Sequence, residues 1–255
     1  MSDSSLPAAE SDDHLGMTDE QWAWFQDYTH GFGEQDENGV DVSLLRENLR
    51  LTPSERVQKF QRFLSLYWRC QRMGPEPDFH DVLAALSARR VRFVLIGGLA
   101  LISHGSEMFT RDLDLCYARE TTNLRALAEA LAPLHPRLRG APEGLPFVLD
   151  ARTLRSGANF TLVTDAGDVD LLGDVTGVES FDALWERSTE AELFGVRVHV
   201  ASLDDLIAMK RAAGRAKDQP HLLELERLRS LVGDEEPVNR GDAASTVKVD
   251  HRESE

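Results

Sequence analysis

The chain has only two cysteines, Cys70 and Cys116, in 255 residues. Two cysteines cannot form a disulfide framework or a structural zinc site by themselves, so a reducing cytoplasm is the expected compartment. Long apolar runs are missing as well, because the longest, at 93–102, is far shorter than the roughly 20 residues that cross a bilayer. The first 13 residues carry acids and no basic residue, unlike a secretory signal. The sequence therefore predicts a cytoplasmic protein with no membrane partner.

Positive charge is scarce. The chain has 28 lysines and arginines against 44 aspartates and glutamates, a formal net charge of −16. Most of the excess lies at the two ends, because residues 1–50 hold 12 acidic and 2 basic residues, and residues 231–255 hold 7 and 3. An acidic chain is not typical of non-specific nucleic-acid binding. In the middle of the chain, however, acidic and basic residues are almost equal in number, so the net charge does not exclude a local basic patch there.

Composition and periodicity divide the chain into four parts. Residues 1–17 and the acidic residues 232–255 are expected to be disordered tails. Residues 18–89 are expected to form a helical N-terminal region, and residues 90–231 one folded domain. The helices expected in the N-terminal region are a short one after Thr18 that carries Trp22, and others at 41–50, 52–72 and 78–90.

The pattern in the folded domain alternates between short strands and amphipathic helices. It predicts an α+β fold in which a small mixed β-sheet has flanking helices. The expected strands lie at 91–96, 111–117, 159–164, 168–172, 190–194 and 196–200. The expected helices lie at 99–104, 121–132, 180–187, 202–213 and 217–231. Residues 135–157 contain three prolines and are expected to be irregular.

Three carboxylates stand out in this domain. Asp112 and Asp114 are two residues apart on an expected strand, so both point to the same face of the sheet. Asp170 lies between two apolar residues on a later strand. If the two strands are neighbours, the three carboxylates converge and raise one another's pKa. A divalent cation such as Mg²⁺, which prefers hard oxygen ligands, would resolve that repulsion.

Two further features would suit a phosphate ligand. Gly97 and Gly98 lie between an expected strand and a helix, where glycine lets the backbone approach a phosphate. A basic segment near the end of the domain carries Lys210 and Arg211 on a helix, followed by Arg215. Such cations could neutralise a triphosphate or an RNA backbone.

Each feature also has a simpler interpretation. The Asp112 and Asp114 pair could lie on a solvated strand face, and Gly97 and Gly98 could be a plain turn. Lys210 and Arg211 could lie on a solvated helix face. The metal interpretation is favoured because the glycines and the third aspartate accompany the pair.

The combined pattern resembles the polymerase-β-type nucleotidyltransferase superfamily. The residues that carry the resemblance are Gly97-Gly98, Thr110-Arg111-Asp112-Leu113-Asp114-Leu115 and Asp168-Val169-Asp170-Leu171. Asp205, Lys210, Arg215 and Asp218 resemble more narrowly the motif of the AbiEii/MenT-type toxin nucleotidyltransferases. The chain departs from that narrower pattern by Gly98 in place of Ser, Met108 in place of Arg and His221 in place of the last Asp.

The resemblance implies a nucleotidyltransferase fold and a set of roles. Asp112, Asp114 and Asp170 would bind two Mg²⁺ ions and, with Lys210, act in catalysis. The residues implied to bind the NTP co-substrate are Gly97, Gly98, Arg111, Arg215 and Asp218. The reaction implied is transfer of a nucleoside monophosphate from an NTP to an acceptor hydroxyl.

The resemblance implies the acceptor and the partners less directly than the reaction. In the related toxins the acceptor is the 3′ end of tRNA and the partner is an antitoxin protein, so tRNA or another RNA and a cognate antitoxin are the expected partners here. A nucleotidyltransferase that modifies a small molecule or a protein is an alternative. A non-catalytic relative that binds nucleotides is another. A cationic groove beside the carboxylates would favour RNA, whereas an acidic pocket would favour a cationic small molecule.

Overall fold

The structure is a computed structural model that describes residue 18 and residues 33–71, 76–142 and 144–234. The tail expected at 1–17 and the helix expected after Thr18 lie outside these residues. Of the tail expected at 232–255, residues 235–255 also lie outside them, whereas 232–234 belong to a helix. Three helices precede the sheet, which confirms the helical N-terminal region for the part described. They are α2 (Val42–Leu49), α3 (Pro53–Gln71) and α4 (Phe79–Ala88). Their buried residues belong to the same hydrophobic core as those of the sheet.

Helix α3 begins as its sequence predicts. The Glu55 N–H donates to Thr52 Oγ1 at 3.3 Å, and the Thr52 N–H donates to a Glu55 carboxylate oxygen at 2.7 Å. This reciprocal capping box satisfies two backbone donors that a helix start leaves free. Val57, Phe60 and Leu64 then point into the core at helical spacing.

In the described residues, seven strands form one mixed sheet in the order β3-β4-β5-β2-β1-β7-β6. The strands are β1 (Phe93–Ile96), β2 (Asp112–Tyr117), β3 (Arg137–Leu138), β4 (Asn159–Thr164), β5 (Gly167–Leu172), β6 (Thr189–Leu193) and β7 (Val196–Val200). β2 pairs with β5 in parallel, as does β1 with β7, and the other pairs are antiparallel. The α+β class with a mixed sheet is confirmed.

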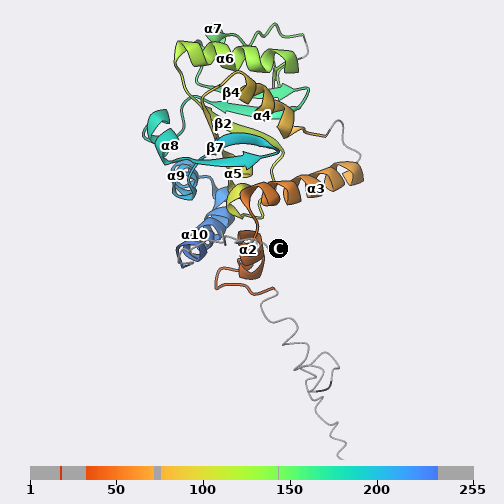
Figure 1. Cartoon of the computed structure of the whole chain (residues 1–255), viewed down its shortest axis with the longest axis vertical. Coiled ribbons are helices and arrows are strands. Elements are labelled where there is room, and N and C mark those ends of the chain that lie inside the picture. The colour runs from red at the N-terminus through yellow and green to blue at the C-terminus, as the bar shows by residue number, and fades with distance from the viewer. Residues whose placement is uncertain (1–17, 19–32, 72–75, 143, 235–255) are drawn as a thin grey trace, which may run out of the picture.

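Helices cover both sides of the sheet (Figure 1). The helices within and after the sheet region are α5 (Gly97–His104), α6 (Thr121–Leu131), α7 (Ala151–Ser156), α8 (Phe181–Arg187), α9 (Leu203–Ala213) and α10 (Gln219–Asp234). In the view of Figure 1, α6 lies above the sheet, α4 overlaps its upper strands, and α3, α5, α9 and α10 lie below it. α5 packs on β1 and β2 and, away from them, on α3 and α9. No helix in the described part of the chain is long and apolar enough to cross a membrane.

The hairpin expected around Gly195 forms between β6 and β7. Phe194 has a φ of 52° and Gly195 a φ of 77°. Two successive positive φ values are those of a type I′ turn, whose twist matches the twist of the flanking strands.

The expectation of an irregular segment at 135–157 is wrong in part. The segment contains β3 and α7, the latter capped by Asp150, which accepts from the Thr153 N–H at 2.7 Å. β3 is only two residues long and forms by pairing with β4, a partner distant in sequence that a local pattern does not indicate. The last helix also begins two residues later than expected, and it ends at Asp234.

Candidate metal and nucleotide site

Four carboxylates lie on one face of the sheet. The parallel pairing of β2 and β5 places Asp112 opposite Asp168 and Asp114 opposite Asp170. The alternating residues of both strands point to the opposite face and are buried: Leu113, Leu115, Val169 and Leu171. Because this apolar face must stay in the core, the aspartates are fixed on the other one.

The predicted convergence of three aspartates is confirmed as geometry. One carboxylate oxygen each from Asp112, Asp114 and Asp170 lies within 4.8 Å of the other two. All three residues are half-buried. Three hard, anionic oxygen donors at this spacing are the donor set that Mg²⁺ prefers.

Gly97 and Gly98 lie directly against this cluster. Ile96, the last residue of β1, is opposite Asp114, so the chain enters α5 beside that carboxylate. Gly97 has a φ of 63°, and a Cβ atom there would lie 2.0 Å from Asp114 Oδ2. A Cβ on Gly98 would lie 2.5 Å from the Cβ of Thr110. The glycines therefore leave the space that the side chains of Asp114 and Thr110 occupy. The predicted contact of Gly97 and Gly98 with phosphate stays a prediction.

Two neutral donors orient the first two aspartates. The Thr110 hydroxyl donates to Asp112 Oδ1 at 2.6 Å, and Thr110 is itself buried. The Gly98 N–H donates to the Asp114 carboxylate. Both carboxylates are thus held by groups from the motif itself.

Burial and mutual repulsion raise the proton affinity of carboxylates in the cluster. Burial, followed by the charges of Asp112 and Asp170, raises the pKa of Asp114 to about 7. Burial also raises the pKa of Asp170, against the opposing effect of Arg139. A carboxylate with a raised pKa in a cluster of like charges is typical of a site that receives a cation.

Sequence reasoning missed Arg139, which lies at the centre of the cluster's ion pairs. Its guanidinium Nη1 is 3.0 Å from Asp168 Oδ2 and 3.8 Å from Asp112 Oδ2, and its Nη2 pairs with Asp170 Oδ1. No local signal indicates this residue, because it follows β3 in a segment that was expected to be irregular. Asp168, by contrast, could have been found from strand parity with Asp170.

An open groove of about 690 Å³ adjoins the carboxylates. Its walls include Asp112 and Asp168, the arginines Arg111 and Arg137, and Trp68 of α3. The structure therefore brings the predicted nucleotide ligand Arg111 to the same groove as Asp112 and Asp168.

The basic segment is placed differently from the expectation. Lys210, on α9, forms an ion pair with Asp218 at 3.1 Å, and both side chains are largely buried. Arg215, also predicted to bind nucleotide, is exposed between them in sequence. Within the described residues, no contact joins Lys210 to the carboxylate cluster, so the roles of these three residues stay predictions.

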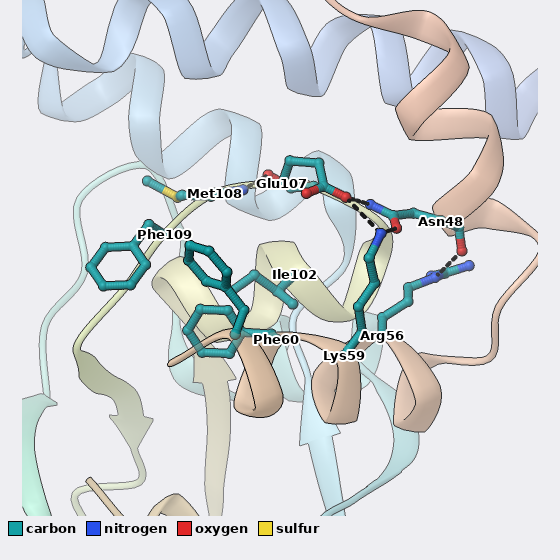
Figure 2. Close-up of a pocket in the computed structure, with 10 residues that line it drawn as sticks. Asn48, Arg56, Lys59, Phe60, Ile102, Glu107, Met108 and Phe109 are labelled. Atoms are coloured by element: carbon teal, nitrogen blue, oxygen red, sulfur yellow. Dashed lines mark hydrogen bonds and ion pairs between the residues drawn. The ribbon is translucent and has the colours of Figure 1, made fainter. Parts of the chain in front are cut away.

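A smaller cavity of about 270 Å³ lies between α3, α5 and the loop after α5 (Figure 2). One wall is polar, where Lys59 Nζ donates to Asn48 Oδ1 at 2.9 Å and pairs with Glu107 Oε1 at 3.3 Å. Phe60 and Phe109 form an apolar wall. None of the clustered aspartates lines this cavity, so it is distinct from the candidate site.

No known family model matches the chain, and no curated protein matches its sequence. Its structure is similar to that of the antibiotic-resistance factor ANT(2'')-Ia, an aminoglycoside nucleotidyltransferase. A solution structure of that protein is 15% identical, with a TM-score of 0.41, and the match covers 60% of this chain and 82% of that one. A crystal structure of ANT(2'')-Ia in complex with adenylyl-2''-tobramycin is 16% identical, also with a TM-score of 0.41, over 60% and 87%. Because these TM-scores are below 0.5, the function of this chain has to be inferred from its own residues.

Proposed function

We propose that the protein is a Mg²⁺-dependent nucleotidyltransferase that moves a nucleoside monophosphate from an NTP to an acceptor hydroxyl. The observation that carries the proposal is the convergence of Asp112, Asp114 and Asp170. Three carboxylates from two strands share one face beside a glycine turn, and the opposite face of both strands is fully apolar. A solvated strand face would not need Gly97 to leave room for Asp114.

Each residue has a defined task in this proposal. Asp112 and Asp114 would hold the divalent cations, and Asp170 would complete the site beside the acceptor hydroxyl and accept its proton. When bound, the cations supply charge neutralisation for the triphosphate and the leaving pyrophosphate. The acceptor oxygen attacks the α-phosphorus in line, and the bond to pyrophosphate breaks as the new ester bond forms. Positioning and electrostatics provide most of the rate in such transfers.

The NTP would lie with its phosphates toward Gly97 and Gly98, where backbone N–H groups at the start of α5 favour an anion. Arg111 lies in the adjoining groove and is the nearest of the predicted cations to the aspartates along the chain. Lys210 would act on the phosphates only after its pair with Asp218 opens.

The groove carries arginines beside its acidic residues, and we propose an RNA 3′ end such as that of tRNA as the acceptor. Arg111 and Arg137 offer charge for backbone phosphates, and the indole of Trp68 offers a surface on which a base can stack. A cationic small molecule is the alternative acceptor, with Glu76 and Asp165 in the same groove as its partners. An antitoxin partner follows only from the toxin resemblance.

The test is transfer of label from each of the four NTPs, in the presence of Mg²⁺, to purified tRNA or to a pool of small amino-sugar acceptors. Wild-type protein should label one acceptor class, and Asp112→Asn should lower transfer by more than about 100-fold. Asp204→Asn is the matched control, because Asp204 is an exposed aspartate on α9 that does not line the groove. Absence of transfer to any acceptor, without pyrophosphate release, would favour a non-catalytic nucleotide-binding relative.

A further inference from the structure

Arg139 gives the carboxylate cluster an internal cation. Its backbone N–H donates to the Thr161 carbonyl at 2.9 Å, which extends the short β3 ladder by one residue and fixes the base of the side chain. The guanidinium then reaches Asp112, Asp168 and Asp170 together. About 30% of the side chain is exposed, so the group lies at the edge of the groove rather than in the core.

Two of these three partners are proposed metal ligands. An arginine keeps its charge at any pH at which the protein is folded, and its planar fork matches carboxylate geometry. Arg139 therefore occupies a lone pair of Asp170 that a divalent cation needs, and its charge lies 3.8 Å from Asp112 Oδ2. A guanidinium and a divalent cation sharing Asp170 would also repel each other at close range.

The third partner, Asp168, is not one of the three converging aspartates. It makes the shorter of the two contacts with Nη1, at 3.0 Å against 3.8 Å for Asp112. Asp168 can thus retain the guanidinium after the contacts with Asp112 and Asp170 open. The side chain would then stay in the groove that Arg111 and Arg137 line.

We propose that Arg139 is the counter-cation of the metal-free site, that binding of a divalent cation displaces it from Asp112 and Asp170, and that Asp168 then holds it where it pairs with the phosphates of the nucleotide. This inference rests on the proposed function, because it takes the three aspartates as metal ligands. It assigns positioning roles to Arg139, which lies outside the sequence motifs, and to Asp168, which lies within one of them but has no predicted role there.

The experiment measures Mn²⁺ binding to the full chain, by the electron paramagnetic resonance signal of free Mn²⁺, for wild type, Arg139→Gln and Arg137→Gln. Arg139→Gln should bind Mn²⁺ about tenfold more tightly, because the competing cation is gone. Arg137→Gln should equal wild type, since Arg137 shares the strand face and the groove but makes no ion pair among the described residues. With Mn²⁺ saturating, Arg139→Gln should bind a non-hydrolysable NTP analogue about tenfold more weakly.

Melting curves complete the test. In EDTA, Arg139→Gln should melt below wild type, and saturating Mn²⁺ should remove the difference. Arg139→Lys keeps the positive charge but lacks the planar guanidinium, so it should bind Mn²⁺ with an affinity between those of wild type and Arg139→Gln. It replaces Arg139→Gln in the test if the glutamine variant does not fold. Unchanged or weaker Mn²⁺ binding by the Arg139 variants, with wild type binding normally, would overturn the inference and leave the proposed function standing. Absence of Mn²⁺ binding by all variants and by wild type would overturn the metal site itself.

Discussion

Gly97 and Asp114 are so close that the glycine cannot carry a side chain, because a Cβ atom on Gly97 would lie 2.0 Å from Asp114 Oδ2. Gly97 directly follows β1, and Asp114 lies within the neighbouring strand β2, opposite Ile96. The left-handed backbone at Gly97 turns the chain into α5 at the place where the carboxylate needs room. The glycine of the motif is therefore a steric requirement of the carboxylate cluster.

Gly97→Ala should lower the free energy of unfolding by about 2–4 kcal/mol and abolish Mn²⁺ binding. Positive φ costs an alanine about 1–2 kcal/mol, and the overlap with Asp114 adds the remainder. Gly39→Ala is the matched control, since Gly39 also has a positive φ, of 79°, but has nothing within 4 Å of its Cβ position. Urea denaturation measures both variants. Equal losses for the two would show that contact with Asp114 has no cost.

The stability of the metal-free protein should depend on pH through Asp114. Its pKa is raised from 3.8 to about 7, so between these values the folded state holds a proton that the unfolded state has released. This contribution is complete below about pH 4 and is lost as pH rises to 7. Asp114→Asn should therefore raise Tm in EDTA at pH 8 and change it little at pH 4. Asp204→Asn, at an aspartate 78% exposed, should show no such divergence.

Much of this site could be predicted from the sequence. The alternation of Asp112 to Tyr117 fixes a strand and the face of its aspartates, and the same parity applies to Asp170. Burial of the leucines and the valine between the aspartates fixes the face that the aspartates share. Their convergence also needs β2 to pair with β5, which a local pattern does not indicate.

The other features of the site depend on contacts between segments that are distant in sequence. Arg139 reaches the cluster only because a two-residue strand pairs with β4, and its own neighbours carry no periodic signal. The resemblance predicts a catalytic role for Lys210 and nucleotide binding for Asp218. In the structure they are each other's partner, because the turn after α9 brings them together.

The two cysteines should differ sharply in reactivity. Cys70 is exposed on α3, whereas Cys116 is buried in β2. Burial raises the pKa of the Cys116 thiol to about 12, so almost no thiolate is present at neutral pH. Iodoacetamide at pH 7.5 should label Cys70 in the native protein and both cysteines in 6 M guanidinium, as read by peptide mass spectrometry. Native labelling of Cys116 at the rate of Cys70 would show that β2 is accessible.

The Lys210–Asp218 ion pair should stabilise the folded state. The side chains are 16% and 10% exposed, so Lys210→Met leaves a buried carboxylate without its counter-charge. Such a loss costs about 3–5 kcal/mol, and the double variant Lys210→Met/Asp218→Leu should recover much of it because no charge then stays buried. Denaturation of the single and double variants at pH 8 measures the coupling. If Lys210→Met costs under about 1 kcal/mol at pH 8, the pair is not a structural one, and the lysine is available to the nucleotide without an opening step.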